Sequence, residues 1–242
     1  MSVTILKIRN LSYTYRGRNS DGLKVTLRSM RLCAGDVKAL TGVSGSGKST
    51  LLECIGLIRE GFNADEFIID DTDIQTQNAA ALAGVRAAKL GFMPQSGGLL
   101  PFLTVRGNIS LQMKLGRRYN SACPPMDKLW EELLEVLRTL EIDSLLDRYP
   151  QELSIGQRQR AVFCKAIAHQ PKLVLIDEPT SALDPLHAQK LFAAIAAIAA
   201  RLKVSVLTVT HDLHLVEKLG IVSCAYQQAQ SSASHSIFAE AL

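Results

Sequence analysis

Short runs of Val, Ile and Leu alternate along the chain with segments of helical periodicity. These runs predict β-strands at residues 3–13, 37–41, 67–70, 89–95, 172–177 and 204–210. An alternation of strands with helices is typical of an α/β domain with a mainly parallel sheet. We expect the first run to enter an antiparallel hairpin and the later runs to form central parallel strands.

Between Gln95 and Gln157 the pattern becomes helical. Within residues 127–140, one helical face is apolar and the opposite face carries Glu and Arg; the apolar positions are Leu129, Leu133, Val136, Leu137 and Leu140. The preceding segment, residues 120–127, contains two consecutive prolines and predicts a loop before the next helix. The whole region therefore reads as a helical insert.

Length and composition are those of an ordinary globular protein. The 242 residues suffice for one large domain, or for one domain with a small insert, and 47% of them are hydrophobic. The net charge of +4 is small and the basic residues are scattered, so we expect no nucleic-acid partner. The five cysteines form no C-x-x-C pair, which argues against a zinc site or disulfide framework and suits a reducing compartment.

No segment has the pattern of a membrane span or a secretory signal. The first residues lack a basic stretch followed by an apolar one. The longest apolar stretch, Leu191 to Ala200, is about half the roughly 20 residues that a bilayer span requires. If the protein works at a membrane, we expect another chain to supply the spanning part.

The strongest chemical signal is the segment GVSGSGKST at residues 42–50. It satisfies G-x-x-x-x-G-K-[ST] and lies between an apolar run and a helical pattern. Its glycines let successive N–H groups point at phosphate oxygens, Lys48 would reach the β- and γ-phosphates, and the Ser49 hydroxyl would bind Mg²⁺. We predict that a nucleoside triphosphate is held by Gly42, Val43, Ser44, Gly45, Ser46, Gly47, Lys48, Ser49 and Thr50.

Two carboxylates end a later apolar run, KLVLIDE. Asp177 and Glu178 would therefore lie at the carboxyl edge of a buried strand, where open α/β sheets bind ligands. We expect Asp177 to hold Mg²⁺, directly or through water, and Glu178 to polarise an attacking water. Together with the loop, this pair predicts a P-loop NTPase.

The segments ELSIGQRQR, LVLIDEPTSALDP and VLTVTHD follow the loop in that order. Together these segments resemble the ATP-binding subunit of an ATP-binding-cassette (ABC) transporter, from Tyr15 to about Val216. The resemblance implies an α/β fold with a P-loop NTPase (RecA-like) core, a mainly parallel sheet, an N-terminal antiparallel β subdomain and an inserted α-helical subdomain. It implies one domain over residues 1–242, with the helical subdomain at about 96–160, and ATP and Mg²⁺ as cofactors.

By this resemblance, further residues acquire roles around the nucleotide. Gln95 would join the Mg²⁺ and the attacking water to the helical insert, and His211 would contact the γ-phosphate. Tyr15 would stack on adenine, with Tyr13 as the competing platform. The pair His211 and His214 has no third ligand within reach in the sequence, so we expect no metal site other than the Mg²⁺ that accompanies ATP.

The family's signature segment corresponds to residues 153–157, at the start of a helix, and contacts ATP held by a partner subunit. The residues that would make this contact are Ser154, Gly156 and Gln157. Asp184 would lie in the loop that links the two nucleotide sites. The resemblance thus implies a head-to-tail homodimer or heterodimer.

The sequence departs from the family pattern at several points. Ile155 stands where the family usually has glycine, and if that position needs a positive φ, strain would make the ATPase active but slow. Lys165 stands where arginine is common, which keeps the charge and loses the fork geometry. After His211 the usual glycine-marked hairpin is not recognisable, and we expect the Gln- and Ser-rich stretch 227–236 to be loose or peripheral.

Partners and direction of transport are less constrained. The resemblance implies separate transmembrane permease subunits, with residues 99–109 helping to form the groove that receives them, and a peripheral position on the cytoplasmic face of the membrane. Some segments resemble exporter ATPases and others importer ATPases, so direction stays open. A nucleotide-switched clamp acting on a membrane partner is the alternative function. The sequence lacks the long coiled coil that a DNA-repair cassette needs, which argues against that class. A small-molecule kinase is also disfavoured, because it would give no role to Ser154, Glu178 and His211.

Overall fold

The computed structural model describes residues 3–15, 22–181, 183–228 and 235–240. Within them, ten strands form one sheet in the order β5-β4-β1-β2-β10-β9-β3-β8-β7-β6. The strands are β1 (Thr4–Thr14), β2 (Lys24–Cys33), β3 (Val37–Thr41), β4 (Glu66–Ile69), β5 (Thr72–Asp73), β6 (Leu90–Met93), β7 (Leu173–Asp177), β8 (Ser205–Thr210), β9 (Val222–Gln228) and β10 (His235–Glu240). The helices are α1 (Lys48–Ile55), α2 (Ala79–Lys89), α3 (Val105–Tyr119), α4 (Met126–Thr139), α5 (Ile155–Ile167), α6 (Pro185–Leu202) and α7 (Leu213–Lys218).

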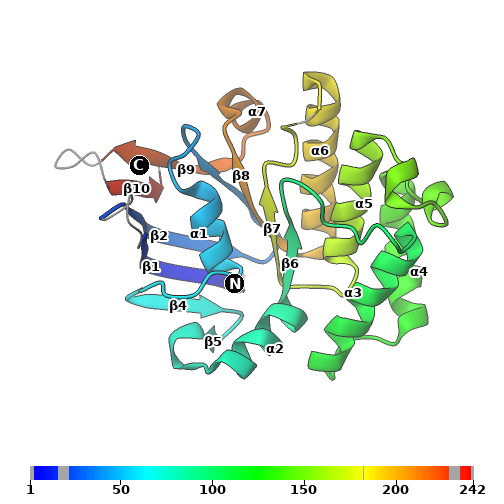
Figure 1. Ribbon diagram of the computed structural model, residues 1–242, viewed down its shortest axis with the longest axis horizontal. Helices are drawn as coiled ribbons and strands as arrows, with labels where there is room; N and C mark the ends of the chain where they lie inside the picture. The colour runs from blue at the N-terminus through cyan, green and yellow to red at the C-terminus, as the bar shows by residue number, and fades with distance from the viewer. Residues whose placement is uncertain (1–2, 16–21, 182, 229–234, 241–242) are drawn as a thin grey trace.

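One half of the sheet is parallel. Strand β3 pairs in parallel with β8 and β9, and β7 pairs in parallel with β8 and β6. All six residues of β8 and the first four of β7 are buried, as expected for strands covered by helices on both faces. The predicted α/β fold with a mainly parallel core is confirmed, and the carboxyl ends of β3, β7 and β8 lie at one edge of this core (Figure 1).

The other half of the sheet is antiparallel. The predicted entry hairpin is present as β1 and β2. The expectation of a central parallel strand at 67–70 is wrong, because β4 pairs antiparallel with β1 and with the short β5. Strand β2 was not predicted, since charged residues interrupt its apolar positions and only alternate ones are buried.

The chain returns to the sheet after His211. Strands β9 and β10 pair antiparallel with each other, β9 lies beside β3, and β10 lies beside β2. The expectation of a loose stretch at 227–236 is therefore wrong for its described ends, because Gln227 and Gln228 belong to β9 and His235 and Ser236 to β10. Residues 229–234 of that stretch lie outside the described residues. Polar composition hid these strands, each of which buries an apolar side chain in the core, Cys224 from β9 and Phe238 from β10.

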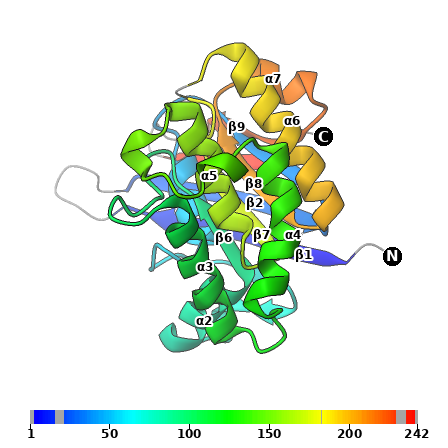
Figure 2. The same cartoon turned by 90° about the vertical axis from the view of Figure 1, so that its right-hand side faces the viewer.

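Helices α3, α4 and α5 gather beside the parallel edge of the sheet (Figure 2). The predicted apolar face of α4 is buried at every position, and residues 120–125 join α3 to α4 as the prolines predicted. Helix α5 continues to Ile167 and packs against β6, where a Cβ on Gly91 would lie 2.3 Å from the Ala166 carbonyl oxygen. These helices thus form one layer anchored to the core through α5.

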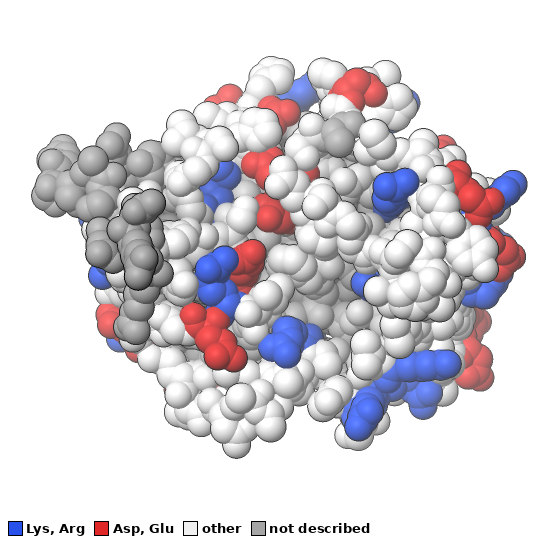
Figure 3. Space-filling model, viewed as in Figure 1, with Lys and Arg blue, Asp and Glu red and all other residues white. Residues whose placement is uncertain are grey.

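Helix α1 packs its apolar side chains into the core between the two halves of the sheet (Figure 1). No helix among the described residues is long and apolar enough to cross a bilayer. On the face shown in Figure 3, acidic and basic side chains form scattered groups separated by wide uncharged areas.

Candidate functional site

Residues 42–50 connect β3 to α1 at the carboxyl edge of the parallel strands. A cavity of about 430 Å³ opens there. It is lined by Tyr15, Ser44, Gly45, Gly47, Lys48, Ser49, Thr50, Gln95, Glu178 and His211. The fold therefore brings together residues from five separate parts of the sequence, all of which were predicted site residues.

The loop curls tightly because its backbone enters the left-handed region. Gly47 precedes α1 with φ 93°, and a Cβ there would lie 2.9 Å from a Val25 methyl on β2. The buried Lys48 ammonium donates to the carbonyl oxygens of Gly42 (2.8 Å) and Val43 (2.9 Å), and the Ser46 hydroxyl also donates to Val43. Gly42, Val43 and Ser46 thus shape the loop without lining the cavity.

Two opposite effects act on the pKa of Lys48. Burial lowers the pKa of Lys48, whereas the nearby carboxylates of Glu178 and Asp177 raise it. An ammonium group in this setting is poorly solvated and lies at the wall of the cavity. It is therefore suited to binding phosphate oxygens.

Two oxygen donors meet across the site. The Ser49 hydroxyl donates to Oδ1 of Asp177 at 3.0 Å, although the residues lie on α1 and β7. Burial raises the pKa of Asp177, and the hydrogen bond from Ser49 opposes that rise. A hydroxyl and a carboxylate at this spacing are the hard oxygen ligands that Mg²⁺ binds through one or two protein groups. The donor set fits the predicted ion.

Glu178 is held by both its backbone and its side chain. It has φ 48° in a non-glycine residue, and its N–H donates to the Val209 carbonyl at 3.0 Å. Its Oε2 lies 2.9 Å from Nδ1 of His211, where the ring nitrogen donates because an ionised carboxylate only accepts. A positive φ outside glycine is uncommon and is enriched at functional sites. The carboxylate is thereby fixed at the cavity wall.

The two tyrosines near the loop differ in position. Tyr15 lines the cavity, and its hydroxyl is hydrogen-bonded to the Thr50 hydroxyl. Tyr13 stands edge-on to Tyr15 and packs under the Arg59 guanidinium, 5.1 Å from its ring centroid. The structure therefore favours Tyr15 over Tyr13 as an aromatic platform at this cavity.

Gln95 follows β6 and reaches the cavity from the helical side. The loop after it turns through Gly97 (φ 77°) and Gly98 (φ 85°). The half-buried Lys165 of α5 donates to the Gly98 carbonyl at 2.7 Å, and burial lowers the pKa of its ammonium. In the sequence, Lys165 stands out only because the family commonly has arginine at this position. Nothing in the sequence links it to Gly98.

The signature residues lie outside this cavity. Ser154 caps α5 and exchanges hydrogen bonds with Gln157: the Gln157 N–H donates to Ser154 Oγ at 3.2 Å, and the Ser154 N–H donates to Gln157 Oε1 at 2.9 Å. Gly156 lines a separate cavity beside α6. Asp184 caps α6, and its pKa is lowered by hydrogen bonds from the His187 backbone and ring. One chain does not bring these residues to its own loop 42–50.

The strain argument for Ile155 is wrong. Ile155 is the first residue of α5 and is not among the described residues with positive φ. A helical backbone suits any L-residue, so the position does not require glycine for conformational reasons here. Its side chain is 56% exposed and extends from the helix start toward solvent.

The histidine pair at the end of β8 does not belong to a metal-binding group. His211 is hydrogen-bonded to Glu178, and His214 is exposed on α7. Among the described residues, no group of three or more His, Cys, Asp or Glu side chains is placed to hold a metal ion.

The chain is similar to a known family and to several known proteins. The family model described as "ABC transporter" matches residues 26–181. The chain is 31% identical over 217 residues to the methionine import ATP-binding protein MetN 1 of Bacillus cereus, covering 89% of this chain and 60% of that protein. It is 31% identical over 218 residues to the lipoprotein-releasing system ATP-binding protein LolD of Buchnera aphidicola, covering 90% of this chain and 92% of that protein. The chain thus spans less than two thirds of the methionine import relative.

Solved structures show the same architecture. The dimeric structure of MJ0796, a bacterial ABC transporter cassette, superposes with a TM-score of 0.74 at 28% identity, covering 91% of this chain and 94% of that one. A dimeric post-hydrolysis state of MJ0796 bound to ADP and Pi superposes with a TM-score of 0.75 at 27% identity, with the same coverage.

Proposed function

Because the chain belongs to the ABC transporter family of ATP-binding proteins, we propose that it binds ATP with Mg²⁺ and hydrolyses it. The observation that carries this proposal is one cavity lined by residues of loop 42–50, Glu178 and His211, with Asp177 hydrogen-bonded to Ser49 of that loop. The reaction class is attack of water on the γ-phosphate, and these groups supply the phosphate-binding, metal-binding and water-orienting chemistry that this reaction requires.

The roles follow from chemistry and position. The N–H groups of the loop and the Lys48 ammonium would bind the phosphates, and Ser49 with Asp177 would hold Mg²⁺. Bound Mg²⁺ supplies positive charge that stabilises the phosphoryl group during transfer. Glu178 would orient the attacking water and accept its proton, while His211 fixes the carboxylate through Nδ1. Gln95 lines the same cavity, and Tyr15 would stack on adenine.

The position of the signature residues supports a two-chain mechanism. Ser154, Gly156 and Gln157 begin an exposed helix start away from their own cavity, as expected for residues that complete the site of a partner. A head-to-tail dimer, as a homodimer or with a second ATP-binding subunit, gives each site a signature from the other chain. Asp184, at the start of α6, would lie between the two sites.

The dimer would drive separate transmembrane permease subunits from the cytoplasmic face of the membrane. The chain would act as a single ATP-binding domain. The helices near residues 96–160 would form a subdomain that moves in response to the bound nucleotide. The MetN and LolD relatives act on different cargoes by name, so the cargo of this chain is set by its membrane partners.

The test is ATP turnover by the purified chain, wild type beside Glu178→Gln, with size-exclusion chromatography in ATP and Mg²⁺. We expect the wild type to hydrolyse ATP and the Gln variant to lose turnover and accumulate as a dimer. The matched control is Glu60→Gln, an exposed position outside the cavity, which should behave as wild type. Turnover by Glu178→Gln at the wild-type rate would remove Glu178 from the mechanism.

A further inference from the structure

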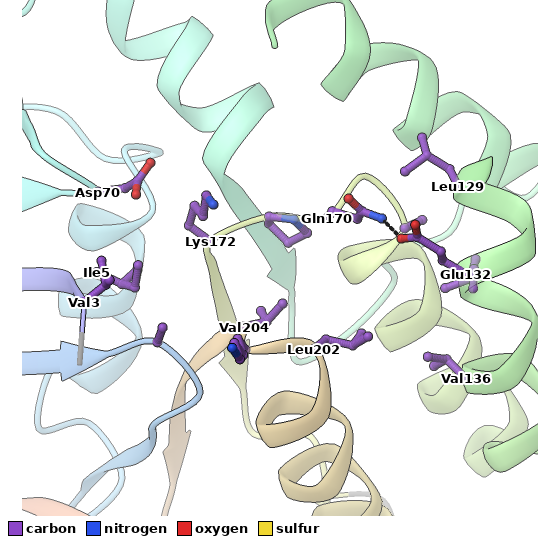
Figure 4. Close-up of a pocket in the computed structure, with 15 residues that line it drawn as sticks. Val3, Ile5, Asp70, Leu129, Glu132, Val136, Gln170, Lys172, Leu202 and Val204 are labelled. Atoms are coloured by element: carbon purple, nitrogen blue, oxygen red, sulfur yellow. Dashed lines mark hydrogen bonds between the residues drawn. The ribbon is translucent and has the colours of Figure 1, made fainter. Parts of the chain in front are cut away.

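A second cavity lies at the opposite edge of the sheet, away from the proposed ATP site. It has a volume of about 410 Å³, close to that of the first cavity. Figure 4 shows α4 on one side of it, β1 on the other, and the turn between α6 and β8 below. It therefore lies between the helical layer and the β core, and none of the residues proposed for ATP lines it.

The floor of this cavity is aliphatic. Ile5, Leu133, Val136 and Val204 line it, and each is at most 7% exposed. No aromatic side chain is among the described residues that line it, so it offers no stacking surface for a flat ring. At its rim, Val3 and Leu202 are 59% and 38% exposed and extend the apolar surface outward. An aliphatic chain suits this interior.

The rim carries two lysines and two carboxylates, and one of the carboxylates is paired with a further lysine outside the cavity lining. Lys172 immediately precedes β7 and Lys203 caps α6; both are exposed, and neither has an ion pair among the described residues. Asp70 is neutralised by Lys89 at 3.0 Å, and Glu132 accepts a hydrogen bond from the Gln170 amide (Figure 4). The rim is left with an excess of one positive charge beside an apolar floor.

We propose that this cavity binds an aliphatic monocarboxylate, with its chain on the Ile5–Val136–Val204 floor and its head group at Lys172 and Lys203. A single negative charge matches the excess at the rim, and charge-assisted hydrogen bonds from two ammonium groups would orient it. Because α4 and the core form opposite walls, the ligand would hold the helical layer against the sheet. This proposal does not depend on ATP hydrolysis.

The experiment is methyl NMR of the full chain with labelled Ile, Leu and Val, titrated with sodium octanoate below its micelle concentration. We expect saturable shifts of the Ile5, Val136 and Val204 methyl signals. The double variant Lys172→Gln/Lys203→Gln should weaken binding by about tenfold, and 1-octanol should bind about tenfold more weakly than octanoate. The control Lys114→Gln/Lys190→Gln, at two other exposed lysines, should bind as wild type.

Four results would overturn the proposal. Absence of saturable shifts at millimolar octanoate would remove the site. Equal binding of octanol and octanoate, or an unchanged affinity in the Lys172 and Lys203 variant, would show that the rim does not recognise an anion. If only phosphatidylglycerol vesicles shifted these methyl signals, the cavity would be a binding site for a membrane surface and not for a free carboxylate.

Discussion

Nδ1 of His211 lies 2.9 Å from Oε2 of Glu178, so the carboxylate proposed to orient water is held by a ring from the end of the neighbouring strand β8. Without the ring, the Glu178 side chain gains rotational freedom in the cavity. The pair therefore behaves as one unit, in which the position of the acid depends on the histidine.

We expect His211→Ala to lower ATP turnover by about 100-fold, within the range typical of a misplaced general base. The measurement is steady-state phosphate release with Mg²⁺ and ATP. His214→Ala is the matched control, since His214 is exposed and lies outside the cavity. If both variants kept the wild-type rate, the contact with Glu178 would have no part in hydrolysis.

The Ser49–Asp177 contact predicts the metal dependence of the site. Asp177→Asn keeps the shape and removes the charge, so we expect the Mg²⁺ concentration for half-maximal turnover to rise by about tenfold or more. Turnover should cease in excess EDTA. Asp143→Asn, at an exposed position on the helical layer, serves as the control. An unchanged Mg²⁺ requirement in Asp177→Asn would exclude this carboxylate as a ligand.

Lys165 is a positioning residue for the loop that carries Gln95. Loss of its 2.7 Å hydrogen bond to Gly98 should let that loop move without changing the loop at 42–50. We therefore expect Lys165→Met to lower kcat by about five- to tenfold with little change in KM for ATP. Lys165→Arg should retain most of the rate because it keeps the charge and a donor. A purely structural role would instead lower stability in both variants and leave kcat unchanged.

The helical start at Ile155 predicts how that position responds to substitution. Because its φ is not positive, glycine relieves no backbone strain, and Ile155→Gly and Ile155→Ala should turn over ATP at the same rate. If both variants differ from wild type by the same amount in their turnover rate, the difference comes from loss of the exposed isoleucine side chain. A rate that rises only in Ile155→Gly would restore the strain argument.

His169 predicts a pH dependence of stability. Burial lowers its pKa to about 4, and its ring bonds the Leu90 carbonyl and the Gln112 amide. The unfolded chain binds a proton near pH 6.5 and the folded chain only near 4, so this contribution is complete above pH 6.5 and lost as pH falls toward 4.

Between pH 7 and 5 we expect the free energy of unfolding to fall by about 2 kcal/mol through His169 alone. Urea unfolding at both pH values measures it. His169→Gln should lose that part of the pH dependence, whereas the exposed His214→Gln should keep it. Equal pH dependence in all three proteins would contradict the assignment.

Local sequence signals predicted much of this molecule because they act over short distances. The spacing within 42–50 and the acids after an apolar run depend on neighbours in the sequence. In the structure most of the loop and Glu178 line one cavity, and Asp177 is hydrogen-bonded to Ser49 of that loop. The Lys165–Gly98 contact joins residues on different elements, so no periodicity reveals it. Strand β2 and strands β9 and β10 were missed because polar residues interrupt their few buried apolar positions, so no apolar run marks them in the sequence.

The order of the strands has a consequence for synthesis. Strands β2 and β3 follow each other in the chain, yet β10 and β9 lie between them in the sheet. A ribosome makes β9 and β10 only after helices α1 to α7, so the facing edges of β2 and β3 stay unpaired throughout most of translation. Unpaired edges are templates for aggregation. The nascent chain should therefore need protection by a chaperone until its final strands emerge.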